Sequence, residues 1–363
     1  MPSTYSSSEW HLMRLLLTVC LTLACFVAQG APLKVAFVYV SPVGDVGWSY
    51  SHDLGRQYLE EHSNGDVVTQ FVESVPEGRK ARETFVKLAQ ENDVIFATSW
   101  GYMVSMERVA EQYPNVKFEH ATGIRRGDNL STYATRIYEA RYLSGIVAAS
   151  MSKTNRIGYV AAFPIPEVIR GLNAFTLGAQ SVNPNVSVAV EWTKAWYDPA
   201  KAKKLSNKLI DEGADVLAQH TDSPAPVEVA QKRGVYAIGY HSDMSAYGTD
   251  SHLTSVIHDW GKIYQTRIKS FINKSSQVED AWTGLKDGSS KLSNINSVVP
   301  RHVIEAVNLA KQKISDGELN IFAGPIRNHK GRTRVKLDKS LADSDLKRMN
   351  WYVAGVEGDL KFY

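Results

Sequence analysis

Short runs of β-branched and other apolar residues alternate along the chain with helical stretches, and this alternation restricts the possible folds more than any other feature. The segments between runs, such as 82–90, 104–113 and 201–212, carry apolar residues at three-and-four spacing with charges between them. Strands separated by helices predict parallel sheets, so we expect an α/β fold of doubly wound units. The nine runs are LKVAFVYV, VVTQFVESV, DVIFATS, VKFEHAT, RIGYVAAF, VSVAVEWT, ADVLAQH, VYAIGY and LTSVIH.

The number of strands predicts two lobes. Nine strands in one sheet would be large for a single core, and the series restarts after a helix expected over 141–151. We therefore place a hinge near residues 136–155. The stretch 287–297, rich in Ser, Lys and Asn, is expected to be a loop. In such folds ligands bind beyond the carboxyl ends of the strands, so the residues directly after each run are the ones to inspect.

The first thirty residues resemble a secretory signal peptide. An apolar run, LLLTVCLTLACFV, occupies 15–27, with Arg14 before it and a small-x-small pattern at 28–31. At about 1.5 Å per residue this run spans about 20 Å, less than the ~30 Å needed to cross a bilayer. We therefore predict that 1–30 is removed after Gly30 and that the mature protein is periplasmic.

Both cysteines, Cys20 and Cys25, lie within this segment, so the mature chain would carry none. An exported protein of this size without disulfides suits a bacterial periplasm. A lipid anchor on Cys25 is the weaker alternative, because Thr22 stands where a lipobox normally has Leu. The start site, Met1 or Met13, stays open.

Charge and motifs exclude several classes of function. The chain of 363 residues has 41 Lys and Arg against 38 Asp and Glu, with no clustered basic excess, which argues against a nucleic-acid partner. There is no GxSxG or HExxH motif, no phosphate-binding Gly-rich loop and no His cluster with metal spacing. We therefore expect a monomeric binding protein with no cofactor or metal. His220 near Asp222 leaves a hydrolase as a remote alternative.

Trp and Asp recur directly after the predicted strands. A flat ligand held between two indoles would bury both rings, while carboxylates accept hydrogen bonds from its edge. This chemistry fits a purine-like ring. The predicted ligand-binding residues are Asp45, Trp48, Trp100, Trp196, Asp222 and Asp243.

Each of these residues also has a structural alternative. Trp48 could instead wedge under its loop as a core residue, which is the weaker interpretation for it, and Trp100 fits a core position as well as a binding one. The three aspartates, Asp45, Asp222 and Asp243, are common turn and N-cap residues. His220 and His241, which also come after strands, would more often hydrogen-bond the backbone than a ligand.

Several longer motifs together resemble the basic membrane protein family, which comprises substrate-binding proteins of ABC importers and includes purine-nucleoside receptors. The similarity covers nearly all of the mature chain. It is carried by GDVGWSYSHDLGR (44–56), EARYLSGIVAASMSKTNRIGYV, FPIPEVIRGLNAFTLGAQSVNP, GADVLAQHTDSPA, AIGYHSDM and LTSVIHDW.

The resemblance implies a type I periplasmic binding protein, in which two lobes are joined by three crossovers. The chain would return to the first lobe around LTSVIHDW and cross again near 285–295. This division assigns 31–136 and 255–287 to the N-terminal lobe, and 137–254 and 288–363 to the C-terminal lobe.

The resemblance also implies roles for individual residues. Trp48 and Trp196 match the aromatic residues that stack on the base, one from each lobe. Asp45 matches the acid three residues before the first of them, and Asp243 matches an acid that holds the polar part of the ligand. His258 replaces a Lys that contacts ribose in nucleoside receptors.

A second departure from the nucleoside receptors concerns the ligand's sugar. Residues 220–223 (HTDS) are bulkier than the family's Gly-rich loop and would fill the space that a sugar needs. We therefore expect a free purine base of the adenine type, with a nucleoside as the alternative.

The predicted function is a periplasmic receptor that closes on a purine by hinge motion and delivers it to an ABC permease at the inner membrane. A cage of Trp and Asp for an organic cation, such as a choline-like or thiamine-like ligand, is the main alternative. A receptor that presents its ligand to a membrane sensor would have the same sequence features.

Overall fold

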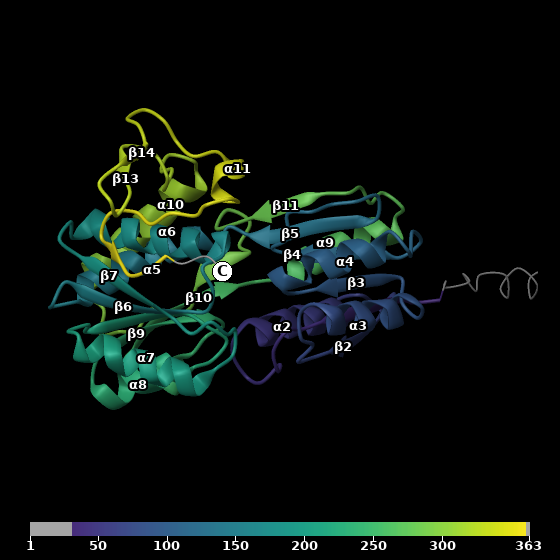
Figure 1. Cartoon of the computed structure of the whole chain (residues 1–363), viewed down its shortest axis with the longest axis horizontal. Helices are drawn as coiled ribbons and strands as arrows, with labels where there is room; N and C mark the ends of the chain where they lie inside the picture. Colours follow the sequence, from purple (N-terminus) through teal and green to yellow (C-terminus); the bar gives the residue numbers. More distant parts are fainter. Residues whose placement is uncertain (1–30, 361–363) are drawn as a thin grey trace, which may run out of the picture.

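The computed structural model describes residues 31–360, which form two lobes lying side by side (Figure 1). The predicted signal segment, with Cys20 and Cys25, lies outside the described residues, as do 361–363. None of the helices within 31–360 is long and apolar enough to cross a membrane.

The first lobe is built on a parallel sheet of six strands in the order β11-β5-β4-β3-β1-β2. Val35 and Phe37 of β1 pack under α2 and α9, whereas Ala36 and Val38 pack under α3 and α4, so the strand is apolar on both faces. The elements are β1 (Leu33–Val38), α2 (Trp48–Glu61), β2 (Val67–Val72), α3 (Arg79–Ala89), β3 (Val94–Ala97), η1 (Trp100–Tyr102), α4 (Met103–Ala110), β4 (Lys117–Ala121), β5 (Leu130–Thr135), α9 (Gly261–Ile272) and β11 (Asp280–Thr283).

The second lobe has a seven-stranded sheet in the order β12-β10-β9-β8-β6-β7-β15, parallel throughout except that β12 runs antiparallel to β10. Helices α5 and α6 cover one face and α7 and α8 the other. The elements are α5 (Ile137–Met151), β6 (Arg156–Ala161), α6 (Pro166–Val182), β7 (Ser187–Trp192), α7 (Pro199–Asp211), β8 (Val216–His220), α8 (Ala225–Arg233), β9 (Tyr236–His241), η2 (Ser245–Tyr247), β10 (His252–His258), β12 (Ser290–Leu292), α10 (Arg301–Ser315) and β15 (Val356–Glu357).

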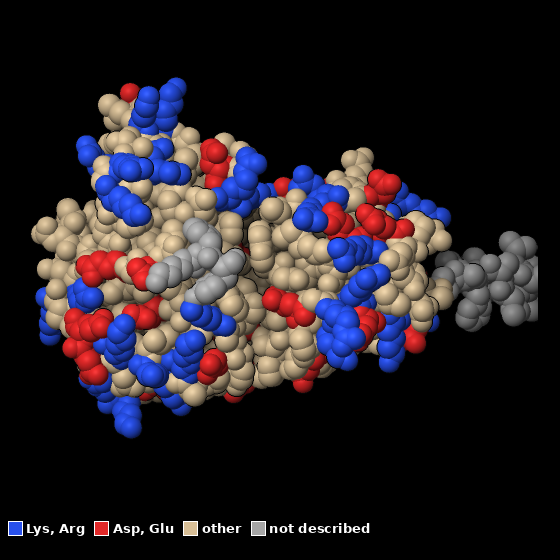
Figure 2. Space-filling view, viewed as in Figure 1, with Lys and Arg blue, Asp and Glu red and all other residues tan. Residues whose placement is uncertain are grey.

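A C-terminal arm, formed by β13 (Ile326–Arg327), β14 (Thr333–Val335) and α11 (Asp343–Leu346), packs on the second lobe. Ile326 and Val335 fix it to the core that contains α5 and α6. Lys and Arg side chains gather over this arm, whereas positive and negative residues are mixed over the rest of the same face (Figure 2).

The chain passes between the lobes three times, at residue 136, at 259–260 and within 284–289. The predicted boundary between 254 and 255 is wrong, because residues 255–258 continue β10 and pair with β9 and β12 in the second sheet. The prediction of a loop over 287–297 is wrong in part, because Ser290–Leu292 form β12 beside β10. In both places a pairing with a distant strand decides the structure.

The predicted fold class, two doubly wound parallel-sheet lobes, is confirmed. Each of the nine strand predictions corresponds to one strand, from β1 to β4 and from β6 to β10. Strand β11, at the edge of the first sheet, and its neighbour β5 were not predicted; β5 (LSTYAT) mixes polar and apolar residues and lacks a continuous apolar run.

Candidate functional site

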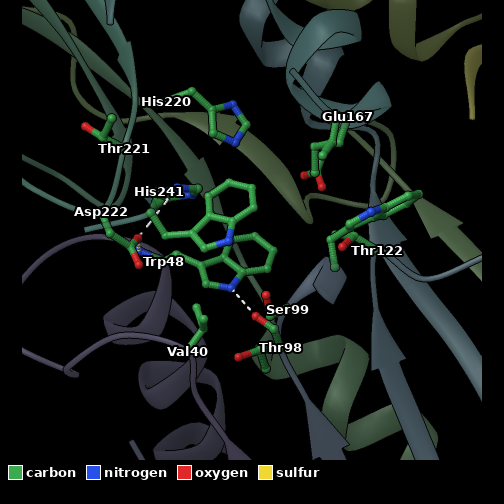
Figure 3. A pocket seen from close by; sticks show the side chains of 13 residues that line it. Val40, Trp48, Thr98, Ser99, Thr122, Glu167, His220, Thr221, Asp222 and His241 are labelled. Carbon is green, nitrogen blue, oxygen red and sulfur yellow. Dashed lines mark hydrogen bonds and ion pairs between the residues drawn. The ribbon is translucent and has the colours of Figure 1, made fainter. Parts of the chain in front are cut away.

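A small cavity lies between the lobes, at the carboxyl ends of the strands of both sheets. Ten of the lining side chains are labelled in Figure 3, where they approach one central space. The first lobe contributes Val40, Trp48, Thr98, Ser99, Trp100 and Thr122, and the second contributes Ile165, Glu167, Trp196, His220, Thr221, Asp222 and His241.

Trp48 is held firmly at the start of α2. Gly47 precedes it with φ of 99°, a conformation that favours glycine, and a Cβ there would lie 3.0 Å from the backbone oxygen of Asp222. The indole N–H donates to the carbonyl oxygen of Thr98 at 2.5 Å (Figure 3). The ring packs edge-on against the buried Trp260 and three histidine rings. Trp48 is therefore half-buried in a fixed orientation at the cavity.

Trp196 approaches the cavity from the other lobe, on the loop after β7. Its ring contacts Phe163 edge-on, with 5.0 Å between ring centroids. Its indole N–H donates to Glu77 of the first lobe at 3.4 Å. Glu77 also accepts hydrogen bonds from the hydroxyl of Ser99 and the backbone N–H of Gly101. The polar edge of Trp196 thus forms a contact between the lobes.

Asp222, on the loop after β8, joins the lobes through its carboxylate. One oxygen accepts from the hydroxyl of Ser41 and the other from the backbone N–H of Trp48. Burial raises the pKa of Asp222 to about 6, and the two hydrogen bonds from Ser41 and Trp48 oppose this rise. The side chain lines the cavity, but both of its oxygens are already used between the lobes.

We expect Asp222→Asn to weaken the contact between the lobes, because asparagine offers one acceptor oxygen and turns an amide N–H toward a second donor. Losing one charge-assisted hydrogen bond would favour the open form by about 1–3 kcal/mol. Small-angle X-ray scattering should show a larger radius of gyration for this variant than for the unchanged protein. Asp243→Asn, an exposed position, is the matched control and should leave it unchanged.

The structure brings together four of the six predicted ligand-binding residues, Trp48, Trp100, Trp196 and Asp222. It does not bring in Asp45 or Asp243, which are exposed and line a separate hollow near the crossover at 259–260.

Asp45 and Asp243 each accept a hydrogen bond from another group of the protein. The carboxylate of Asp45 accepts a hydrogen bond from Tyr247 of the second lobe. That of Asp243 accepts from the backbone N–H of Ser245 at 2.9 Å, where η2 begins. The turn alternative therefore describes Asp243 better than the ligand-binding one.

Glu167 and His220 complete the cavity, and Glu167 was absent from the predicted set. Its side chain points into the central space from the first turn of α6 (Figure 3). The same rule that selected the other residues, inspecting the positions after each strand, would have found it beyond RIGYVAAF. His220 ends β8, and its Nδ1 is buried without a hydrogen-bond partner among residues 31–360.

A cluster of four buried histidines, His52, His220, His241 and His258, lies at and beneath the cavity floor. The rings of His241 and His258 are stacked, with centroids 5.3 Å apart, and His258 and His52 each stack on Trp260. Burial lowers the pKa of all four, and neighbouring positive or titratable groups, Arg141 among them, lower it further in His220, His241 and His258. The four imidazoles are therefore neutral at pH 7.

No group of His, Cys, Asp or Glu side chains among the described residues is arranged to hold a metal ion. His258, which replaces the ribose-contacting Lys, does not line the cavity. Its Nδ1 instead lies 2.7 Å from the hydroxyl of Thr135.

Comparisons with known proteins agree with this architecture. Residues 33–321 match the family described as ABC transporter substrate-binding protein PnrA-like. The chain is 42% identical over 348 residues to a purine-binding protein of Brucella abortus, which covers 94% of this chain and 99% of that protein. It is 40% identical over 334 residues to a Haloferax volcanii protein named as the putative glucose-binding protein of an ABC transporter, covering 92% and 82% respectively.

A solved structure supports the fold. The solute-binding protein of an ABC transporter from Aeropyrum pernix superposes with a TM-score of 0.70 at 21% identity, covering 82% of this chain and 95% of that one. The predicted two-lobed, type I periplasmic binding protein architecture is confirmed by this likeness.

Proposed function

Because the chain belongs to the family of PnrA-like ABC transporter substrate-binding proteins, we propose that it binds a purine base between the indoles of Trp48 and Trp196. The predicted resemblance to the basic membrane protein family is confirmed, and the chain is a substrate-binding protein of an ABC transporter. Such a protein takes a small-molecule ligand and has a permease partner, and the family consists of receptors rather than enzymes.

The observation that carries this proposal is that two indoles from opposite lobes line one cavity that also contains carboxyl groups. Stacking on an aromatic side chain contributes about 1–3 kcal/mol per base, and purines offer a flat face to each ring. The N–H groups at the edge of a base match the carboxyl acceptors. The name of the Brucella abortus relative is consistent with the same ligand class.

Closure of the hinge is favoured by the same arrangement. A ligand that contacts both lobes binds the closed form more tightly than the open one and therefore shifts the population toward it. The bonds from Ser41 and Trp48 to Asp222, and from Trp196 to Glu77, join the lobes around the cavity and add to this preference.

We favour a free base over a nucleoside. His220, Thr221 and Asp222 are all buried at the cavity wall, where a sugar would need space. The two hydrogen bonds between Asp222 and the first lobe also hold its carboxylate in place at this wall.

We propose a monomer, exported to the periplasm by the segment 1–30, that releases its ligand to the permease without chemical change. No cofactor is required for such a cycle.

The experiment that tests this function is ligand identification followed by thermal shift. Native mass spectrometry of the purified protein should show a bound purine. After removal of that ligand by unfolding and refolding, adenine should raise the melting temperature, since a ligand at 100 times its Kd stabilises the native state by about 2.7 kcal/mol. Adenosine, glucose and choline complete the panel, and a shift with glucose or choline alone would contradict the purine assignment.

A further inference from the structure

Glu167 is a buried acceptor without a partner in the protein. The residue is 9% exposed, and its carboxyl group makes no hydrogen bond or ion pair with any group in residues 31–360. Figure 3 shows the side chain directed into the central space of the cavity. Its carboxyl oxygens are not among the sealed, unpartnered atoms of the described residues and instead face the cavity, where a ligand donor can reach them.

The groups around Glu167 influence whether its carboxyl group is ionised. It occupies the first turn of α6, where the N-terminal end of the helix dipole favours a negative group. Burial raises the pKa of Glu167, whereas the buried guanidinium groups of Arg170 and Arg141 lower it. In its ionised form the carboxylate only accepts hydrogen bonds.

We propose that Glu167 accepts a hydrogen bond from an exocyclic amine of the base and thereby selects amino-purines over their oxo counterparts. This inference rests on the proposed function and narrows its ligand class. An amino group at the purine 6-position donates to the carboxylate, as in adenine. In the same pose hypoxanthine would turn its 6-carbonyl, a second acceptor, toward the carboxylate, and it would have to shift to offer its N1–H instead.

The neighbouring groups do not supply this selection. His220 also lines the cavity, but a neutral imidazole carries one donor and one acceptor and so can pair with either base. The carboxylate of Asp222 is already held by Ser41 and Trp48. Among the described lining residues, Glu167 is thus the carboxylate that makes no hydrogen bond within the protein.

Glu167→Gln tests the proposal, because glutamine keeps the shape but carries one acceptor and one donor and can pair with either edge. Isothermal calorimetry would compare adenine with hypoxanthine. We expect the unchanged protein to prefer adenine by at least tenfold, and Glu167→Gln to bring that ratio within threefold of one. Glu191→Gln alters a half-buried carboxylate of the second lobe that pairs with Lys208 and does not line the cavity, and should keep the ratio of the unchanged protein.

These measurements distinguish a failure of the proposed function from a failure of the role proposed for Glu167. Binding of neither base by the unchanged protein would overturn the proposed function and this inference with it. Equal binding of both bases, or an unchanged preference in Glu167→Gln, would overturn the role of Glu167 while leaving the purine assignment in place. Glu167→Ala is the second variant: it should lose at least tenfold in adenine affinity with a circular dichroism spectrum like that of the unchanged protein.

Discussion

Between pH 6.5 and 5.5 the free energy of unfolding is expected to fall by about 4 kcal/mol, because the four clustered histidines are neutral in the fold and charged in the unfolded chain. Burial lowers the pKa of His52, His220, His241 and His258 below the ordinary value. The stability associated with keeping these four imidazoles neutral is fully present above about pH 6.5. It is lost as the pH falls from there toward the pKa values that the histidines have in the folded protein. Each contributes about 1 kcal/mol over that interval.

Other buried titratable groups change the size of the expected fall in the free energy of unfolding, but not its direction. Burial raises the pKa of Asp222 to about 6 and that of Glu119 to about 7, so their contributions to stability are lost as pH rises and partly oppose the histidines. Burial lowers the pKa of His120 to about 4 and also lowers that of His252, and these two histidines add to the acid effect. The net expectation is loss of stability in mild acid.

Urea unfolding at intervals from pH 8 to pH 5 would measure the effect. In His258→Asn the amide replaces Nδ1 as the hydrogen-bonding group near Thr135. Because the variant lacks one of the four titrating histidines, the fall in the free energy of unfolding between pH 6.5 and 5.5 should be smaller by about a quarter. His62→Asn alters an exposed histidine and is the control. A free energy of unfolding that stays constant between pH 7 and 5 would contradict neutral burial of the cluster.

Trp196→Ala is expected to weaken purine binding by about 5- to 150-fold, the equivalent of about 1–3 kcal/mol of lost stacking. The side chain is half-buried at the cavity and also contributes the hydrogen bond to Glu77, so its removal lowers both ligand contact and closure. Calorimetric titration with adenine would measure this change in affinity.

Trp192→Ala is the matched control for this titration. This tryptophan ends β7, is half-buried and donates to the carbonyl oxygen of Asp359, away from the cavity. Its removal should leave affinity within twofold. Unchanged affinity in Trp196→Ala would remove the second aromatic face from the proposed site.

Trp48→Ala also tests whether the base stacks between two indoles, but it is expected to change stability as well as binding. The ring of Trp48 packs against His52, His241, His258 and Trp260, so truncation should lower the free energy of unfolding by about 3 kcal/mol as well as weaken binding at least tenfold. Trp48→Phe retains an aromatic face and should recover most of the lost stability.

Local pattern predicted the strands well because each buried strand of a parallel sheet is a continuous apolar run bounded by polar residues. The pattern also marked the run LTSVIH as a strand, but the lobe boundary placed within it, which followed from the family resemblance, was wrong because the partner strands of this run lie in the second sheet. It also missed β12, whose three residues (SKL) have no strand pattern of their own and form a strand by pairing with β10.

The candidate site was predictable where its residues come directly after strands, as Trp48, Trp100, Trp196 and Asp222 do. Asp45 and Asp243 come after strands too, yet they face the outer hollow. Whether a residue on such a loop points into the cleft depends on backbone turns, such as that at Gly47, that composition and spacing do not reveal.

The sequence by itself determined the fold class, the two lobes and the family, because these depend on the period and order of apolar residues along the chain. The tertiary structure alone decided which side chains meet. Glu167 is one more acidic residue at the start of a helix until folding buries it at the cavity and leaves it without a partner. Asp222 becomes a bond between lobes only when Ser41, 181 residues earlier, is brought to it. Such contacts depend on the packing of distant segments, which no local pattern encodes.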